Sequence, residues 1–355
     1  MRTFIFMILA AAYLLLTGCD VHQWPECRPD PYKRVTVRLR FDPDLYLWEH
    51  YYDPKREYPE EVYPDAAVDD RHPGTTEVYS NALSTGEMFI SLKVYNAGNN
   101  DNSVAEYTFT RDLALGYDCD VEIELLDGSY EMVVWSHLLE DSYAASYYEP
   151  GDFRGVYIIG DNYCGSTDYR DCFRGRAPFS FPVVEVADDD DDVTEYLCEV
   201  DMRRPLGKFE FVTTDLTEFL DREAERRGLS TRADIDDYRV VISYPYYYPN
   251  AYSIITDDIT SDSGYLFETK MTVTGQSEAS MGFDYVFIKN IPDGAVQAQV
   301  AVFDLAGNRV ANSQVIMVPI RRDHHTLLRG TFLSMDAKGG VGVNPDYDGD
   351  HNVTM

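Results

Sequence analysis

The sequence predicts a mainly β protein made of two tandem β-sandwich domains, with one short helix in the second domain. Short segments of alternating apolar and polar residues recur about every ten to fifteen positions, as they do in sandwiches. Tyrosine, which favours strands, occurs 28 times in the chain. Only one segment has the apolar spacing of an amphipathic helix.

Length and charge limit the class of protein. The chain has 355 residues, which allows two domains at roughly 150 residues each. It carries 30 Lys and Arg against 62 Asp and Glu, a formal net charge of −32. Nucleic-acid binding and electrostatic adhesion to anionic lipid both need a cationic surface, so the sequence argues against them. Because 45% of the residues are hydrophobic, we expect a folded chain.

The first residues have the features of a bacterial lipoprotein signal peptide. Arg2 precedes an apolar run over residues 4–16, which is too short to span a bilayer as a helix. Leu16, Thr17 and Gly18 then lead to Cys19 in the pattern of a lipoprotein processing site. We therefore expect residues 1–18 to be removed and Cys19 to be acylated, at about 0.8 kcal/mol of membrane affinity per buried methylene. Residues 19–31 contain three prolines and would form an extended lipidated tether.

The first sandwich domain is predicted over residues 32–203. Residues 32–41 alternate, with Val35, Val37 and Leu39 on one face, and predict a half-buried strand. Residues 42–71 have no period and predict a long loop. Further strands are expected at residues 87–94, 106–111, 117–126, 131–137, 156–159, 179–187 and 194–202.

The second sandwich domain is predicted over residues 204–355, because Pro205 marks a boundary. A strand at residues 206–212 precedes a helix that Thr214 would cap and Gly228 would end. Its buried stripe would be Leu216, Phe219 and Leu220, with Asp221, Arg222, Glu223 and Glu225 in solvent. Strands are expected at residues 238–244, 264–272, 281–288, 295–304, 312–320 and 326–333.

Five cysteines remain besides the lipidated one, so at least one has no intramolecular partner. Cys164 and Cys172 lie in one Gly/Asp/Tyr-rich stretch, which makes them the favoured disulfide pair in an oxidising envelope. The alternative is that all five are buried or loop thiols. No Cys-x-x-Cys or His-Glu-x-x-His spacing occurs, so the sequence predicts no metal site.

The motifs of common enzymes are also missing from the sequence. It has no Gly-x-Ser-x-Gly elbow, no phosphate-binding glycine loop and no dinucleotide fingerprint, so we expect neither a cofactor nor catalysis. The aspartate run at residues 188–192 and the acidic residues 346–350 lack the ligand spacing of a calcium loop and are interpreted as solvated segments.

Aromatic residues provide the candidate contact sites. Tyr246, Tyr247 and Tyr248 lie between two prolines, where rings on a stiff loop can stack on sugars or enter a partner's groove. Trp48, followed by further aromatic residues, is a second candidate of the same kind. The competing interpretation is that these side chains cap the edge of a sandwich.

Several motifs together resemble a family of lipoproteins from gut Bacteroidales that has no assigned activity. The matching segments are residues 19–25, 35–41, 44–52, 134–136, 169–175, 204–209, 249–252, 324–330 and 344–350. The family is similar in layout to FimB-type fimbrial anchor and accessory lipoproteins. The resemblance implies two transthyretin-like or immunoglobulin-like sandwiches, fimbrial or other envelope subunits as partners, and no catalytic residues.

These observations predict an outer-membrane lipoprotein, periplasmic or surface-exposed, that acts in fimbria assembly or adhesion without catalysis. The Cys19 lipid would hold it to the outer membrane. The alternative is a surface glycan-binding lipoprotein that uses its tyrosine-rich loops.

Overall fold

The computed structural model describes residues 32–53, 60–61, 77–140, 146–160, 163–181, 196–291 and 293–334. The predicted signal peptide, tether and Cys19 lie outside this range, as do the two acidic segments. The described chain is mainly β with one α-helix, which confirms the predicted class. None of its helices is both long and apolar enough to cross a bilayer.

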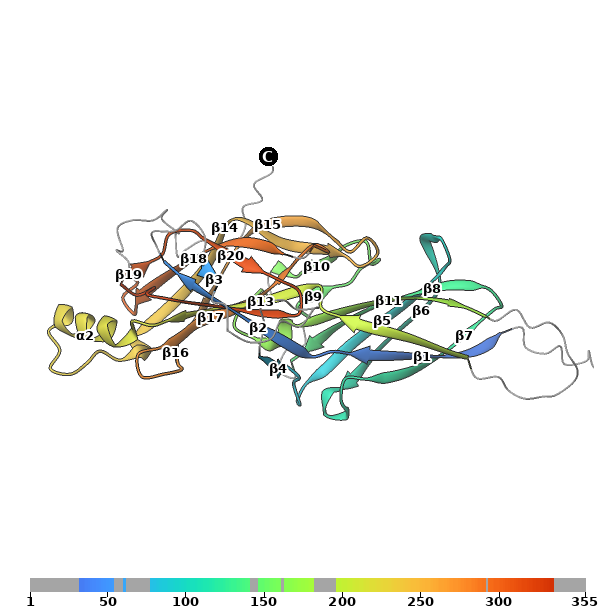
Figure 1. Cartoon of the computed structure of the whole chain (residues 1–355), viewed down its shortest axis with the longest axis horizontal. Coiled ribbons are helices and arrows are strands. Elements are labelled where there is room, and N and C mark those ends of the chain that lie inside the picture. The colour runs from blue at the N-terminus through green and yellow to red at the C-terminus, as the bar shows by residue number, and fades with distance from the viewer. Residues whose placement is uncertain are drawn as a thin grey trace, which may run out of the picture.

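Three seven-stranded sheets form two lobes that lie end to end along the long axis of the molecule (Figure 1). The first lobe is one sheet in the order β6-β5-β8-β11-β12-β1-β7. Its strands are β1 (Lys33–Phe41), β5 (Glu87–Asn96), β6 (Asn99–Asp112), β7 (Cys119–Leu125), β8 (Ser129–Leu139), β11 (Cys172–Ser180) and β12 (Tyr196–Arg203).

The second lobe contains the other two sheets. One has the order β19-β18-β14-β10-β9, with β15 paired to β14 and β20 to β18. Its strands are β9 (Tyr148–Glu149), β10 (Val156–Ile158), β14 (Tyr238–Ser253), β15 (Asp258–Thr269), β18 (Gly294–Asp304), β19 (Arg309–Asn312) and β20 (Ile316–Ile320). The other has the order β16-β17-β13-β21-β2-β3, with β4 on β2. Its strands are β2 (Asp44–Tyr52), β3 (Glu60–Glu61), β4 (Val78–Ser80), β13 (Leu206–Thr213), β16 (Thr272–Val273), β17 (Ala279–Phe287) and β21 (His324–Gly330).

The predicted domains, residues 32–203 and 204–355, do not coincide with the two lobes. The chain crosses between the lobes several times before Arg203. Strands β2, β3 and β4 pair in the sheet of β21, and β9 and β10 pair in the sheet of β14. The predicted loop at residues 42–71 therefore contains β2, which runs parallel to β21 from Tyr46 opposite His324 to Tyr52 opposite Gly330. In Figure 1, β1 and β2 follow one another along the long axis, one in each lobe. Each lobe is therefore built from several segments that are separate in the sequence, because strands that follow one another in the chain pair in different sheets.

Two apolar cores fill the lobes. The first-lobe core contains Val35, Val37 and Leu39 of β1, as the alternation predicts. The second-lobe core is larger and also takes in Val133 and Trp135, which lie on the face of β8 opposite the first core. The two lobes are therefore packed together by buried apolar side chains.

The helix α2 (Leu216–Arg227) confirms the one predicted helix. Leu216, Phe219 and Leu220 are buried as expected, and Gly228 ends the helix in the left-handed conformation. The N-cap is Asp215, one residue after the predicted Thr214. Glu223 is buried rather than solvated, because its carboxylate accepts a hydrogen bond from Arg226 at 2.9 Å and faces Tyr238.

Candidate functional site

Only part of the tyrosine-rich segment is available for contacts. The β14–β15 ladder shifts between Tyr244 and Tyr248, so residues 245–247 bulge out of β14. Tyr246 and Tyr247 are 55% and 67% exposed on this bulge. Pro245 fits there because a bulge does not need its missing N–H group.

Tyr248 and Trp48 are buried, contrary to the contact role predicted for them. Tyr248 is 0% exposed, and its hydroxyl accepts from Arg170 at 2.6 Å and donates to the carbonyl of Tyr285 at 2.8 Å. Trp48 is 5% exposed and lies under the guanidinium of Arg321, 4.0 Å from the ring centroid. Both side chains stabilise the fold, as the competing interpretation holds.

Cys164 and Cys172 are free thiols in the structure, so the predicted disulfide is not formed there. The Cys172 side chain is enclosed in the second-lobe core, and burial raises the pKa of its thiol well above the usual value. The Cys164 thiol is directed instead to the hydroxyl of Tyr147, at 3.6 Å.

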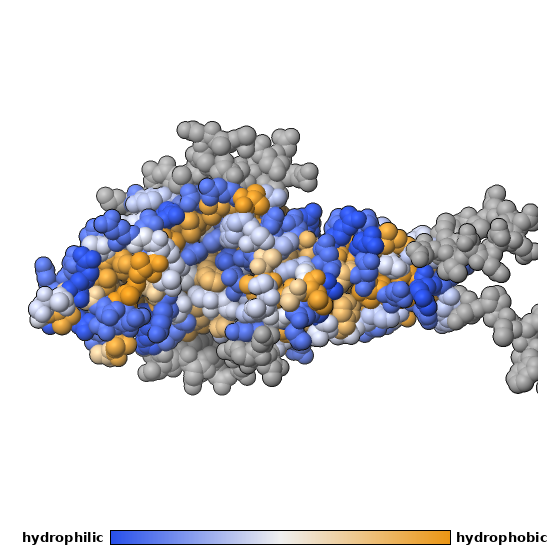
Figure 2. Space-filling model, turned by 90° about the horizontal axis from the view of Figure 1, so that it is seen from below, coloured by the Kyte–Doolittle hydropathy of each residue, from blue (hydrophilic) through white to orange (hydrophobic). Residues whose placement is uncertain are grey.

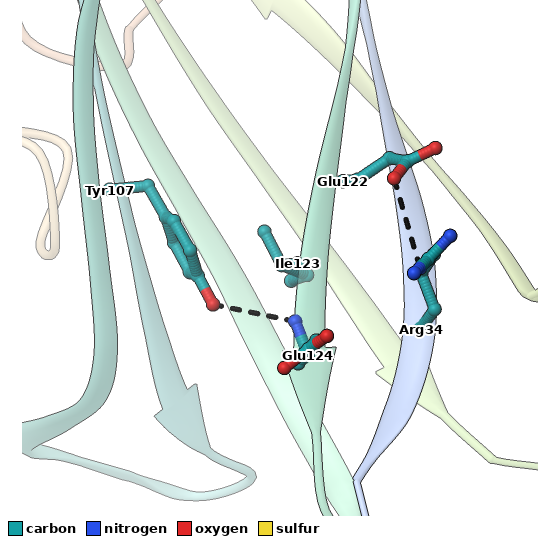
Figure 3. Close-up of a pocket in the computed structure, with 5 residues that line it drawn as sticks. All are labelled: Arg34, Tyr107, Glu122, Ile123 and Glu124. Atoms are coloured by element: carbon teal, nitrogen blue, oxygen red, sulfur yellow. Dashed lines mark hydrogen bonds and ion pairs between the residues drawn. The ribbon is translucent and has the colours of Figure 1, made fainter.

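An open seam runs between β6 and β7, the two end strands of the first-lobe sheet. These strands are consecutive, joined through the short 3₁₀ helix η1 (Leu113–Leu115), yet β6 pairs with β5 and β7 with β1. The Glu124 backbone N–H, on β7, donates to the Tyr107 hydroxyl of β6 at 3.4 Å (Figure 3). A tyrosine side chain is longer than the ~4.8 Å that separates paired strands, so the two strand backbones stand apart here.

The floor of the seam is apolar. Ala105, Tyr107 and Phe109 of β6 point toward the first-lobe core, as do Cys119 and Val121 of β7, yet all five are only partly buried. A pocket of about 240 Å³ lies here, lined by Arg34, Tyr107, Glu122, Ile123 and Glu124 (Figure 3). The face in Figure 2 shows orange hydrophobic patches between blue ones on the first lobe. The seam thus exposes core side chains beside two strand edges.

Charged side chains line the β7 side of the seam. Arg38 of β1 binds Asp120 of β7 through two hydrogen bonds, of 2.9 and 3.0 Å, and these lower the pKa of Asp120. Arg34 lies 3.8 Å from Glu122, and the pair is drawn in Figure 3. These pairs join β7 to β1 and leave its other edge turned toward β6.

Sequence reasoning placed strands at β6 and β7 but missed the seam. Alternation shows which side chains face the core and cannot show that two neighbouring edges fail to pair.

One buried Ser–His contact could suggest nucleophilic catalysis. The Trp135 indole N–H donates to Nδ1 of His137 at 3.0 Å, so the neutral ring carries its proton on Nε2, 2.6 Å from the Ser146 hydroxyl. Ser146 in turn donates to the Tyr148 carbonyl at 2.7 Å. Burial lowers the pKa of His137 to about 3. His137 therefore donates to Ser146 instead of accepting its proton, which is the reverse of base catalysis.

The fold and the seam define a two-lobed, β-rich protein with two unpaired strand edges in its first lobe and no cofactor-type motif in its sequence. A family model described as a family of unknown function, DUF6562, matches residues 68–355. The chain belongs to that family.

The solved structures that match this chain include two fimbrial proteins and a proposed adhesin. The fimbrial anchor protein Mfa2 from Porphyromonas gingivalis is 12% identical, with 79% of this chain and 82% of that chain covered and a TM-score of 0.35. The tip fimbrial protein Mfa3 from the same organism is 11% identical, with 81% of each chain covered and a TM-score of 0.35. A proposed adhesin from Bacteroides thetaiotaomicron is 12% identical, with 81% of each covered and a TM-score of 0.44. No curated protein matches the sequence.

Proposed function

We propose that the protein is a lipid-anchored subunit of the cell envelope, of fimbrial anchor or accessory type, that acts in fimbria assembly or adhesion without catalysis. Its seam would receive an extended segment of another envelope subunit. The observation that carries this proposal is the half-exposed apolar floor between the unpaired edges of β6 and β7. An extended segment added there would hydrogen-bond to both edges and bury its alternate side chains against Phe109 and Val121.

The fimbrial part of the proposal rests on the resemblance of the sequence motifs to fimbrial anchor lipoproteins. The acyl chain expected at Cys19 would hold the end of the molecule at which β1 begins. The acidic surface suits binding to proteins and not to nucleic acid or anionic lipid.

A photo-crosslinker placed in the seam tests the proposal. Phe109 is replaced by p-benzoylphenylalanine in the full chain, expressed in a fimbriate host strain and irradiated on cells. We expect an adduct with a fimbrial subunit, identified by mass spectrometry and mapped to an extended segment of that subunit. Leu305, which is 76% exposed in a second-lobe turn, is the matched control position and should give no such adduct. Equal adducts from both positions, or none from Phe109, would contradict the proposal.

Glycan binding is the second candidate, favoured by the exposed rings of Tyr246 and Tyr247. Exposed tyrosines stack on the apolar faces of sugars. If this function holds, the protein binds saccharides on a glycan array and the double variant Y246A/Y247A loses that binding. The matched control is Y157A, because Tyr157 is 51% exposed on β10 in the same sheet. No binding by the unaltered protein would exclude this candidate.

A further inference from the structure

The junction between the lobes is crossed repeatedly by the chain. Among the strands that the structure describes, the chain passes between lobes from β1 to β2, β4 to β5, β8 to β9, β10 to β11 and β12 to β13. We call residues 163–171, which enter β11, the strap. It includes the 3₁₀ helix η3 (Asp168–Arg170). Charged side chains that lie at these crossings are buried, which is costly unless each has a partner.

Arg204, at the crossing from β12 to β13, is 1% exposed and contacts two other crossings. Its Nε lies 2.8 and 2.9 Å from the two carboxylate oxygens of Asp171, the last residue of the strap. Its terminal nitrogens donate to the carbonyls of Asp42, Pro43 and Asp44, at 3.2, 2.9 and 2.7 Å, where β1 passes into β2. One guanidinium therefore ties three passages of the chain together.

Asp171 extends the same contact to the other passages. It is 0% exposed, and its carboxylate also accepts from Asn81, at 3.3 Å, between β4 and β5. Its backbone carbonyl accepts from Leu138 N–H at the end of β8, at 3.2 Å. Four of the five crossings thus meet the Arg204–Asp171 side-chain pair, and the Asp171 backbone carbonyl contacts the end of β8, just before the fifth.

The strap is held in the second lobe by a second buried pair. Arg170 is 0% exposed and bonds to the Asp284 carboxylate, with the Tyr163 ring 4.6 Å from its guanidinium carbon. Asp284 also accepts from the Tyr163 hydroxyl at 2.6 Å. Asp168 bonds to Lys208 of β13 at 2.7 Å. The strap cannot leave the second lobe without exposing or unpairing these charges.

We infer that the Arg204–Asp171 pair is a lock that makes the two lobes one cooperative unit. The apolar contacts around Trp135 hold the lobes in place, and the lock prevents the crossings from sliding or opening separately. Both lobes would then unfold together when the protein is denatured.

Urea unfolding followed by pulsed hydrogen exchange tests the lock. Peptides from β7 and β12 report on the first lobe, and peptides from β17 and β18 on the second. The unaltered full chain should lose protection in both lobes at one urea concentration. The variants R204K and D171N should lose it in two steps, with midpoints separated by about 0.5–1 M urea. R204K keeps the charge but lacks the forked donors that reach Asp171 and three carbonyls at once.

Controls separate a lock from general destabilisation. The double variant R38A/D120A removes an exposed ion pair within the first lobe and should keep one coincident transition. If D171N does not fold, R204M/D171L removes the pair without leaving a buried charge and should show the two steps. Coincident transitions in all folded lock variants would overturn the inference, because the apolar contacts would then suffice. Two steps in the unaltered chain would also overturn it.

Discussion

Asp323 is a carboxylate in an unfavourable position at the junction. It lies one residue before β21, with φ at 57°, and its Oδ1 is shielded from solvent without a hydrogen-bond partner. Burial raises its pKa to about 6, against the opposing effect of Arg204. Because the pKa is higher in the folded state, this group contributes stability below pH 4, and that contribution is lost as the pH rises through 6.

The variant D323N should therefore be more stable than the unaltered protein at pH 7.5, by about 3 kcal/mol at ~1.4 kcal/mol per pKa unit. Asparagine tolerates the left-handed backbone at this position. The difference in the free energy of unfolding, measured by urea titration, should shrink as the pH falls to 4. A difference that does not change with pH would contradict this account.

Asp304 provides a control of opposite sign. Burial opposes ionisation there too, but hydrogen bonds from Asn308 and from backbone N–H groups lower the pKa of Asp304. D304N should be destabilising at pH 7.5, and its effect should fade as the pH falls through the lowered pKa.

At the scale of elements, β13 depends on a close approach of two backbones. A Cβ atom at Gly207 would lie 2.5 Å from the Arg321 carbonyl oxygen, which belongs to the backbone and cannot rotate away. We expect G207A to destabilise the protein by about 1–3 kcal/mol through overpacking. At Gly264 the nearest atom would be 3.7 Å away, so G264A is the matched control and should have a small effect in thermal unfolding.

The seam between β6 and β7 makes a second prediction about elements. Y107F removes the hydroxyl that accepts the Glu124 N–H. The free energy of unfolding should fall by at most about 0.5–1.5 kcal/mol, because the bond is long. Amide exchange measured by NMR should speed up at Glu124. It should stay unchanged at Val133, which lies in the ladder of β8. Unchanged exchange at Glu124 would show that the Tyr107 contact does not protect it.

Most strands and the helix could be predicted because the apolar residues within each of them recur with the period of a strand or a helix. Strands β1 and β12 and helix α2 have a buried face that repeats every second residue or every helical turn. Strand β2 was missed because one of its alternating buried residues, His50, is polar, and Leu45 is out of phase with Trp48, His50 and Tyr52. Its pairing with β21, which lies more than 270 residues away, makes it a strand.

At the scale of the whole molecule, the proposed anchoring in the envelope would depend on an acyl chain at Cys19. C19S should abolish incorporation of labelled palmitate and release the protein from the membrane fraction, since a tether without acyl chains has no affinity for the bilayer. Fractionation and palmitate labelling of cells that express C19S check this. The control C119S changes a half-buried thiol of β7 and should leave labelling intact. Labelling that persists in C19S would contradict the predicted anchor.

For the candidate sites, the sequence located the residues, and the tertiary structure decided which of them are exposed or paired. Tyr246, Tyr247 and Tyr248 are equivalent in sequence, but the bulge in β14 exposes the first two, and Arg170 and Tyr285 enclose the third. The disulfide expected from the proximity of Cys164 and Cys172 is not formed. Both side chains pack at the second-lobe core, but the Cys164 thiol is directed to the Tyr147 hydroxyl.

By itself, the sequence determined the β class, most strands, the helix and the expected lipid site, because each depends on residues that are near one another in the chain. Only the tertiary structure decided which strands pair, how the chain passes between the lobes, and where β6 and β7 leave a seam. Those features depend on contacts between distant residues such as Asp171 and Arg204, whose pairing no local period encodes.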